Sequence, residues 1–154
     1  MPSTLNQYQQ PVGESVPHWT ARVHPPRNPI EGQYCRLEPL EPHHAADLFA
    51  AFSQAPDGRD WTYMPVGPFD DAASYREYVE RAAVSPDPQH YAVIDLKRGT
   101  AIGTLALMRI DRANGVIEVG NVAFSPLLKR TPISTEAQYL LMKHAFDELG
   151  YRRY

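Results

Sequence analysis

Two adjoining stretches decide the fold: Val116-Ile-Glu-Val-Gly-Asn-Val-Ala-Phe124 and Ser125-Pro-Leu-Leu-Lys-Arg-Thr-Pro-Ile-Ser-Thr-Glu-Ala137. The first is apolar on both alternating faces, which predicts a central strand covered on two sides. In the second, Pro132 occupies a plausible first helical position, and Gly150 provides an end for the helix that follows. The inward face of that helix is predicted to consist of Ile133, Ala137, Leu140, Leu141, Ala145 and Leu149.

The remaining elements can be placed outward from this strand and helix. Going back along the chain, the patterns predict strands over 101–110 and 90–96, and a helix that begins near residue 72 and ends before Pro86. They also predict a helix over 42–52 and a strand over 33–37 that ends before Pro39. Asp70 or Asp71 is a candidate cap for the helix that begins near residue 72. Beyond Gly150, residues 151–154 read as the beginning of another strand. This order predicts an α/β fold of the α+β type, a mixed sheet with helices on both faces.

Residues 1–32 contain six prolines and no apolar periodicity, so we predict an extended Pro-rich arm there and a single domain over 33–154. Val16, Trp19 and Val23 are the arm residues expected to dock on the domain.

Composition excludes several classes of function. The chain has 154 residues and a net charge of -3, which does not call for a nucleic acid or an anionic membrane as partner. No run approaches the roughly 20 apolar residues of a membrane span, and the first residues lack a secretion signal, so we predict a cytoplasmic protein. The single cysteine, Cys35, excludes an internal disulfide and a thiolate metal site.

No metal site is predicted from the six histidines, which are scattered along the sequence. His43 and His44 are neighbours on a predicted helix and are expected to point about 100° apart, so that they cannot share one ion. The sequence also lacks a Gly-x-Ser-x-Gly elbow and a P-loop, which leaves hydrolase and kinase functions without support.

Glu118 is the carboxylate that the central strand would carry among apolar neighbours. In such surroundings it could act as a general base or acid. The structural alternative is an ion pair with an arginine such as Arg109 on the adjacent strand. Two residues on, Gly120 indicates a bulge or the close approach of a ligand.

The loop before the last helix offers unpaired N–H groups, the positive end of a helix dipole, Lys129, Arg130 and three hydroxyl groups. An anion of the phosphate type suits this combination. The alternative is that Thr131 is a simple N-cap and the basic pair is solvated.

Trp61, Tyr63 and Met64 lie on a proline-rich segment between two predicted helices. Such a segment is typical of a lid or a pocket wall that could hold an amine by cation–π contact, or of an apolar plug over the core.

Taken together, these features resemble the GNAT-type N-acetyltransferases, in particular the RimJ/RimL-like branch. The resemblance rests on the order of elements and covers residues 33–154. The matching stretches are Arg36-Leu-Glu-Pro-Leu40, Ile102-Gly103, the strand glutamate Glu118, Ser134-Thr-Glu-Ala137 and Phe146-Asp-Glu-Leu-Gly150.

The resemblance implies transfer of an acetyl group from acetyl-CoA to a primary amine, in a small molecule or at a protein N-terminus, with Glu118 as the base and no metal. The acceptor would lie against Trp61, Tyr63 and Met64. The pantetheine arm would lie along Asn121, Val122, Ala123 and Phe124, and the pyrophosphate against Lys129, Arg130, Thr131, Ile133, Ser134 and Thr135. The sequence departs from the family in having Arg130 and Pro132 where glycines are expected.

Members of that family continue after Tyr151 with a further helix and two strands. The resemblance therefore implies the N-terminal portion of a longer enzyme, incomplete at its C-terminus, with little activity on its own. An open sheet edge would favour a homo-oligomer. The alternative function is a non-catalytic acyl-CoA-binding or interaction module that has kept the fold.

Overall fold

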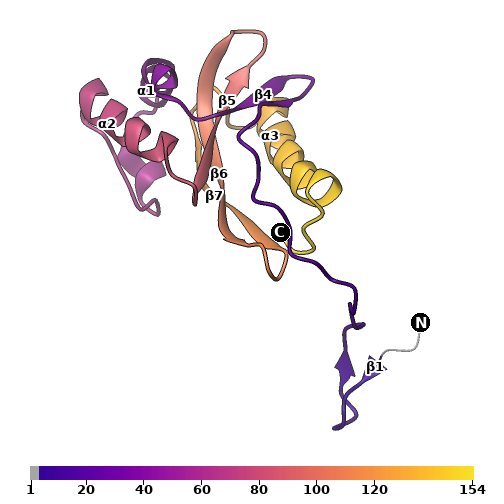
Figure 1. The fold of residues 1–154 in the computed structure, drawn as a ribbon. Coiled ribbons are helices and arrows are strands. Elements are labelled where there is room, and N and C mark those ends of the chain that lie inside the picture. The colour runs from indigo at the N-terminus through magenta and orange to yellow at the C-terminus, as the bar shows by residue number, and fades with distance from the viewer. Residues whose placement is uncertain (1–3) are drawn as a thin grey trace.

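The computed structural model describes residues 4–154, and a five-stranded antiparallel sheet lies at its centre (Figure 1). The strands follow the order β3 (Ile30–Glu31), β4 (Cys35–Pro39), β5 (Gln89–Asp95), β6 (Thr100–Asp111) and β7 (Val116–Phe124). Helices α1 (Ala45–Phe52) and α2 (Ala72–Ala83) cover one face, and α3 (Pro132–Lys143) covers the other. This arrangement confirms the predicted α/β fold with helices on both faces of the sheet.

β5 is the central strand, and all seven of its residues are buried. Tyr91 and Val93 face the core that α3 closes, whereas Ala92 and Ile94 face the core beneath α1 and α2. Because successive residues of a strand point to opposite faces, one strand supplies both cores.

The prediction that residues 116–124 form the central strand is wrong, because β7 is the last strand in the sheet order. Only Ile117 of its residues is fully buried. Val119, Val122 and Phe124 are half-buried against the α3 core. Apolar residues on both faces therefore reflect partial cover of an edge strand.

The helices begin close to the predicted positions. Asp71 caps α2, since its Oδ1 accepts a hydrogen bond of 2.7 Å from the N–H of Ser74. The helix predicted from Pro42 is divided into a 3₁₀ turn, η1 (Pro42–His44), and α1. The last helix continues as a π-helical turn, η3 (His144–Glu148), before Gly150 adopts a φ of 68°. None of the helices within residues 4–154 is long and apolar enough to cross a membrane.

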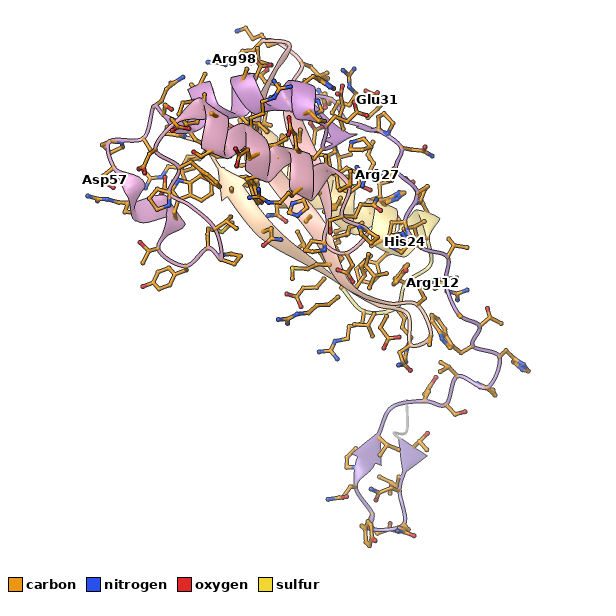
Figure 2. The ribbon with its side chains drawn as sticks, turned by 60° about the vertical axis from the view of Figure 1, so that its left-hand side comes forward. His24, Arg27, Glu31, Asp57, Arg98 and Arg112 are labelled. Carbon is orange, nitrogen blue, oxygen red and sulfur yellow. The ribbon has the colours of Figure 1, made fainter. Side chains whose placement is uncertain are left out.

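The N-terminal segment is extended, and its hairpin of β1 (Thr4–Leu5) and β2 (Pro11–Val12) stands away from the sheet (Figures 1 and 2). Trp19 docks on the β6–β7 turn, where its indole Nε1–H donates to the carbonyl of Ala113 at 2.7 Å. Val16 and Val23 stay exposed, so the prediction that they dock is wrong. β3 lies within the stretch predicted as an arm and pairs with β4.

The final residues run beside the start of β7. Val116 and Arg153 form a single parallel bridge, and the N–H of Ile117 donates to the carbonyl of Arg153 at 3.0 Å. Tyr151 is buried, and its hydroxyl donates to the carbonyl of Val23 at 2.9 Å. Residues 151–154, predicted as the beginning of another strand, therefore form one parallel bridge with β7.

Glu136 joins α3 to the turn between β3 and β4. Its carboxylate accepts hydrogen bonds from the N–H groups of Gln33, Tyr34 and Cys35 at 2.6, 2.7 and 2.8 Å. Burial opposes ionisation of this carboxyl, but the three backbone donors outweigh burial and lower the pKa of Glu136. The contact fixes α3, and with it the loop at the start of α3, against the sheet.

We expect Glu136→Gln to lower the free energy of unfolding at pH 7 by about 1–3 kcal/mol, because an amide accepts these bonds more weakly than a carboxylate. The pKa is lower in the folded state, so this stabilisation is complete above the ordinary glutamate value of 4.5 and is lost as the pH falls through the folded value. Urea titrations should therefore show the two proteins converging on acidification. Glu77→Gln, at an exposed position of α2, is the control. A stability difference that is the same at pH 7 and pH 3 would contradict the assignment.

Candidate active site

The C-terminal half of β7 is irregular, and the irregularity leaves backbone groups without a partner strand among the described residues. Its register against β6 shifts between Gly120, which faces Ala106, and Ala123, which faces Thr104. Asn121, inside this bulge, has a φ of 47°, a conformation that asparagine tolerates better than most residues. Within residues 4–154 the bridge at Val116 is the only strand contact on the outer edge of β7.

The space beside the Cα of Gly120 is filled by another side chain of the protein. A side chain there would begin 2.1 Å from the sulfur of Met108 on β6, so the close approach predicted at this glycine is made by Met108. The bulge, which was the other prediction for this position, is present.

A cavity of about 240 Å³ lies where the end of β7 meets the loop between α1 and α2. It is lined by Phe52, Ala55, Asp60, Trp61, Val122, Ala123, Phe124, Pro126 and Lys129. The structure thus brings Trp61 together with three of the four residues predicted to contact pantetheine and with Lys129. Asn121 is not part of the lining.

Of the three predicted acceptor-binding residues, only Trp61 lines this cavity. Its ring packs edge-on against Phe52 and Phe69, at centroid distances of 5.3 and 5.5 Å. Tyr63 is 98% exposed, which makes its prediction as a wall residue wrong for this conformation. Met64 is half-buried and lies outside the lining.

An open groove next to the cavity runs over the start of α3. Phe124, Lys129, Arg130, Ser134, Thr135 and Gln138 line it, so the groove and the cavity share Phe124 and Lys129. No hydrogen-bond partner for the backbone N–H groups of Arg130, Thr131 and Ile133 occurs in the part of the chain that the structure describes. These donors and the two cations are the features that an anion requires.

Arg130 has a φ of 59°, the left-handed conformation that glycine adopts without strain. The loop therefore keeps the backbone shape of a glycine at this position although the residue is an arginine. Pro132 is at the first position of α3, where the fixed φ of proline suits the helix.

Two of the three hydroxyls at the start of α3 bind backbone carbonyls within the protein. The hydroxyl of Thr131 donates to the carbonyl of Leu128, and that of Ser134 donates to the carbonyl of Thr131, each at 2.7 Å. Thr131 stands at the N-cap but makes no side-chain cap. Ile133 packs its side chain against the α3 core, so only its backbone can face a ligand.

Asp60 and Phe52 belong to this cavity and were not identified from the sequence. Asp60 lies in η2 (Gly58–Trp61), and its Oδ2 is 2.5 Å from Nζ of Lys129. Its position directly before Trp61 was the available signal. Phe52 resembled an ordinary core residue of α1, because the stripe of an amphipathic helix does not distinguish a core from a cavity wall.

The predicted burial of Glu118 is wrong. Its side chain is 46% exposed, and Oε2 accepts from Nη1 of Arg109 at 3.2 Å, which is the ion pair given above as the structural alternative. The reason is the edge position of β7 together with a second bulge near Arg109, where Asp87 accepts the N–H groups of Arg109 and Ile110 at 2.9 Å each.

His43 and His44 do not point apart as predicted, because they belong to the 3₁₀ turn η1. Their ring centroids are 3.9 Å apart, and with Glu38 they could form a group of three metal ligands. His44, however, accepts the N–H of Glu41 at Nδ1 and contacts Glu38 through Nε2 at 2.9 Å. Glu38 also pairs with Arg36. These contacts fit a cap of η1 better than a cation site.

Cys35 is not a candidate nucleophile. Burial, followed by the hydrogen bond to Glu136 and the charges of Glu136 and Asp95, raises the pKa of its thiol to about 12. The thiol is therefore protonated at neutral pH.

Comparison with known proteins identifies the family. The family model described as an acetyltransferase (GNAT) domain matches residues 35–154. The chain belongs to the GNAT acetyltransferase family. A comparison with curated proteins gave no match.

Solved structures agree with this assignment. A GCN5-related N-acetyltransferase from Brucella melitensis is 44% identical over 89% of this chain, with a TM-score of 0.86. A probable GNAT-family acetyltransferase from Chromobacterium violaceum is 35% identical over 93% of this chain, with a TM-score of 0.81. The present chain spans 62% of the length of the first protein and 71% of the second. A GNAT-family acetyltransferase from Bacillus anthracis, 17% identical over 79% of this chain and 68% of its own, shares the fold with a TM-score of 0.64.

The left-handed conformation of Arg130 can be tested by comparing two substitutions. Arg130→Ala and Arg130→Gly both remove the charge, but only glycine relieves the strain of a positive φ. We expect the glycine variant to be more stable than the alanine variant by about 1 kcal/mol in urea unfolding. Equal stabilities, or a more stable alanine variant, would show that the loop does not hold this conformation in solution.

Proposed function

We propose that this chain is an N-acetyltransferase that moves the acetyl group of acetyl-CoA to a primary amine. The observation that carries the proposal is the continuity of the groove and the cavity, which share Phe124 and Lys129. One bound molecule could place its pyrophosphate over the start of α3 and its thioester beside the end of β7. Membership of the GNAT family supports this reading.

In the groove, the pyrophosphate would meet the N–H groups of Arg130, Thr131 and Ile133 and the charges of Lys129 and Arg130. Ser134 and Thr135 would complete the wall. The pantetheine arm would pair with the open backbone of β7 from Asn121 to Phe124. An extended chain that adds to a free strand edge gains main-chain hydrogen bonds.

The acceptor would enter from the side of Trp61, whose ring could hold an ammonium by a cation–π contact. The amine nitrogen, once deprotonated, attacks the thioester carbonyl. A carbon–nitrogen bond forms, the carbon–sulfur bond breaks, and the thiolate of CoA leaves. The nitrogen gives up its extra proton and the thiolate takes one up, so the products are the amide and CoA as the thiol. Both a small-molecule amine and a protein N-terminus fit this chemistry, and activity of the RimJ/RimL type, in the cytoplasm, remains part of the proposal.

Glu118 is the proposed base, acting directly or through water. Its side chain is 46% exposed, so water can reach it, and it is paired with Arg109. The same ion pair also favours a second candidate function, a non-catalytic acyl-CoA-binding module. Pro132 adds to this alternative, because it removes one N–H from the loop.

Charge reversal tests the pyrophosphate site. Lys129→Glu together with Arg130→Glu should weaken the binding of CoA to this chain by about tenfold or more, because two cations become anions beside a phosphate group. Calorimetry with CoA measures the change. Lys97→Glu with Lys143→Glu alters the net charge equally at exposed positions and serves as the control. The proposed site is wrong if both double variants bind CoA equally well.

A pH–rate profile tests the role of Glu118. If it is the base, Glu118→Gln should lower kcat by about 10²–10⁴ in an acetyl-transfer assay with a mixed panel of primary amines. Arg109→Gln, which keeps the carboxylate and removes its partner, should retain most of the rate. An unchanged kcat and pH profile in the glutamine variant would show that Glu118 is not the base and has only a structural role in the ion pair with Arg109. If CoA binds while acetyl transfer is absent from the unmodified chain, the result favours the binding module.

A further inference from the structure

The ion pair between Asp60 and Lys129 connects the two halves of the proposed site. Asp60 lies in η2, between α1 and α2, whereas Lys129 lies in the loop between β7 and α3. Nζ and Oδ2 are 2.5 Å apart, and the side chains are 42% (Lys129) and 37% (Asp60) exposed. Both residues line the cavity beside Trp61.

Lys129 also lines the groove over the start of α3, next to Arg130. Its ammonium therefore lies at the boundary between the place for an anion and the place for an acceptor. A lysine side chain is long and flexible, and an ion pair this exposed contributes little to stability. A doubly charged pyrophosphate in the groove would compete well for that ammonium.

Loss of Lys129 would leave Asp60 as an unpaired carboxylate in the cavity wall. Arg59, its neighbour, contacts Asp57 through two guanidinium nitrogens at 2.8 and 2.7 Å, so Asp57 competes with Asp60 for this cation. Figure 2 shows Asp57 at the side of the molecule that carries the α1–α2 loop, away from the arm residues His24 and Arg27. Asp60 and Trp61 line the same cavity, and a carboxylate and an indole ring are both groups that bind an ammonium.

We propose that the ammonium group of Lys129 changes partner when acetyl-CoA binds. It moves from the carboxylate of Asp60 to the pyrophosphate, and Asp60 then binds the ammonium group of the acceptor. The inference rests on the proposed function and adds to it: the acceptor binds as a cation, and bound acetyl-CoA strengthens its binding. By linkage, each ligand strengthens the binding of the other to the same extent.

The test uses this chain, CoA without an acetyl group, and n-butylammonium as the amine probe, with n-butanol as its uncharged counterpart. Calorimetry measures CoA binding. The binding of butylammonium, with and without saturating CoA, is measured from the change in the NMR chemical shift of the Trp61 indole N–H. In the unmodified chain we expect CoA to tighten butylammonium binding by about tenfold and to leave butanol unaffected.

Three variants resolve the exchange. Asp60→Asn should bind CoA at least as tightly as the unmodified chain, because the competitor for Lys129 is gone, and should lose the effect of CoA on butylammonium. Lys129→Met should bind butylammonium equally well with and without CoA. Asp60→Glu keeps the charge and should keep the coupling. Asp70→Asn, at an exposed aspartate of the same loop, is the control and should match the unmodified chain.

The outcomes separate the two proposals. If CoA does not bind the unmodified chain, the proposed function fails, and the exchange fails with it. If CoA binds normally but does not strengthen butylammonium, or if Asp60→Asn weakens CoA, only the exchange is overturned. If CoA still strengthens butylammonium binding in Asp60→Asn, the exchange is also overturned, because a group other than Asp60 would then bind the ammonium.

Discussion

The burial of β5 on both faces is the constraint on which the rest of the structure depends. A strand with every residue buried must pair its backbone on both edges, which β4 and β6 provide, and must cover its two side-chain faces separately. Tyr91 and Val93 are covered from the side of α3, and Ala92 and Ile94 from the side of α1 and α2. The loop after α1 and the loop before α3 then reach the end of β7 from opposite layers. β7 lies outside this constraint, so it can hold a bulge and an open edge.

The loop before α3 shows how an anion site can keep its shape with unusual residues. Arg130 adopts the positive φ that glycine would supply, and Pro132 occupies the helical position that least needs an N–H. The hydroxyls of Thr131 and Ser134 donate to backbone carbonyls. Attraction for an anion here thus depends more on the charges of Lys129 and Arg130 than in a glycine-rich loop, and it should be correspondingly sensitive to salt.

Local signals in the sequence were sufficient for the order of the longer helices and strands after residue 33, for the bounds of β7 and for a cap at Asp70 or Asp71. They failed wherever the answer depended on distant partners. The two-faced apolar pattern of residues 116–124 looks the same under full cover and beside a cavity, so the edge position of β7 and the exposure of Glu118 could not be read from it. Tyr63 lies in an irregular loop, where no periodicity indicates which way a ring points. Asp60 could be identified as a site residue only from the fold, because its partner Lys129 comes after the whole sheet in the sequence.

The α1–α2 loop does not depend on the ion pair between Asp60 and Lys129, so a change of partner at Lys129 need not move the loop. The loop is held at its base by aromatic contacts of Trp61 with Phe52 and Phe69. These contacts bury apolar surface and do not depend on the charge of Asp60. An anion that takes Lys129 away therefore alters the electrostatics of the cavity while its walls stay in place. A site built in this way can respond to its first ligand by a local exchange of charge partners, without the cost of closing a lid.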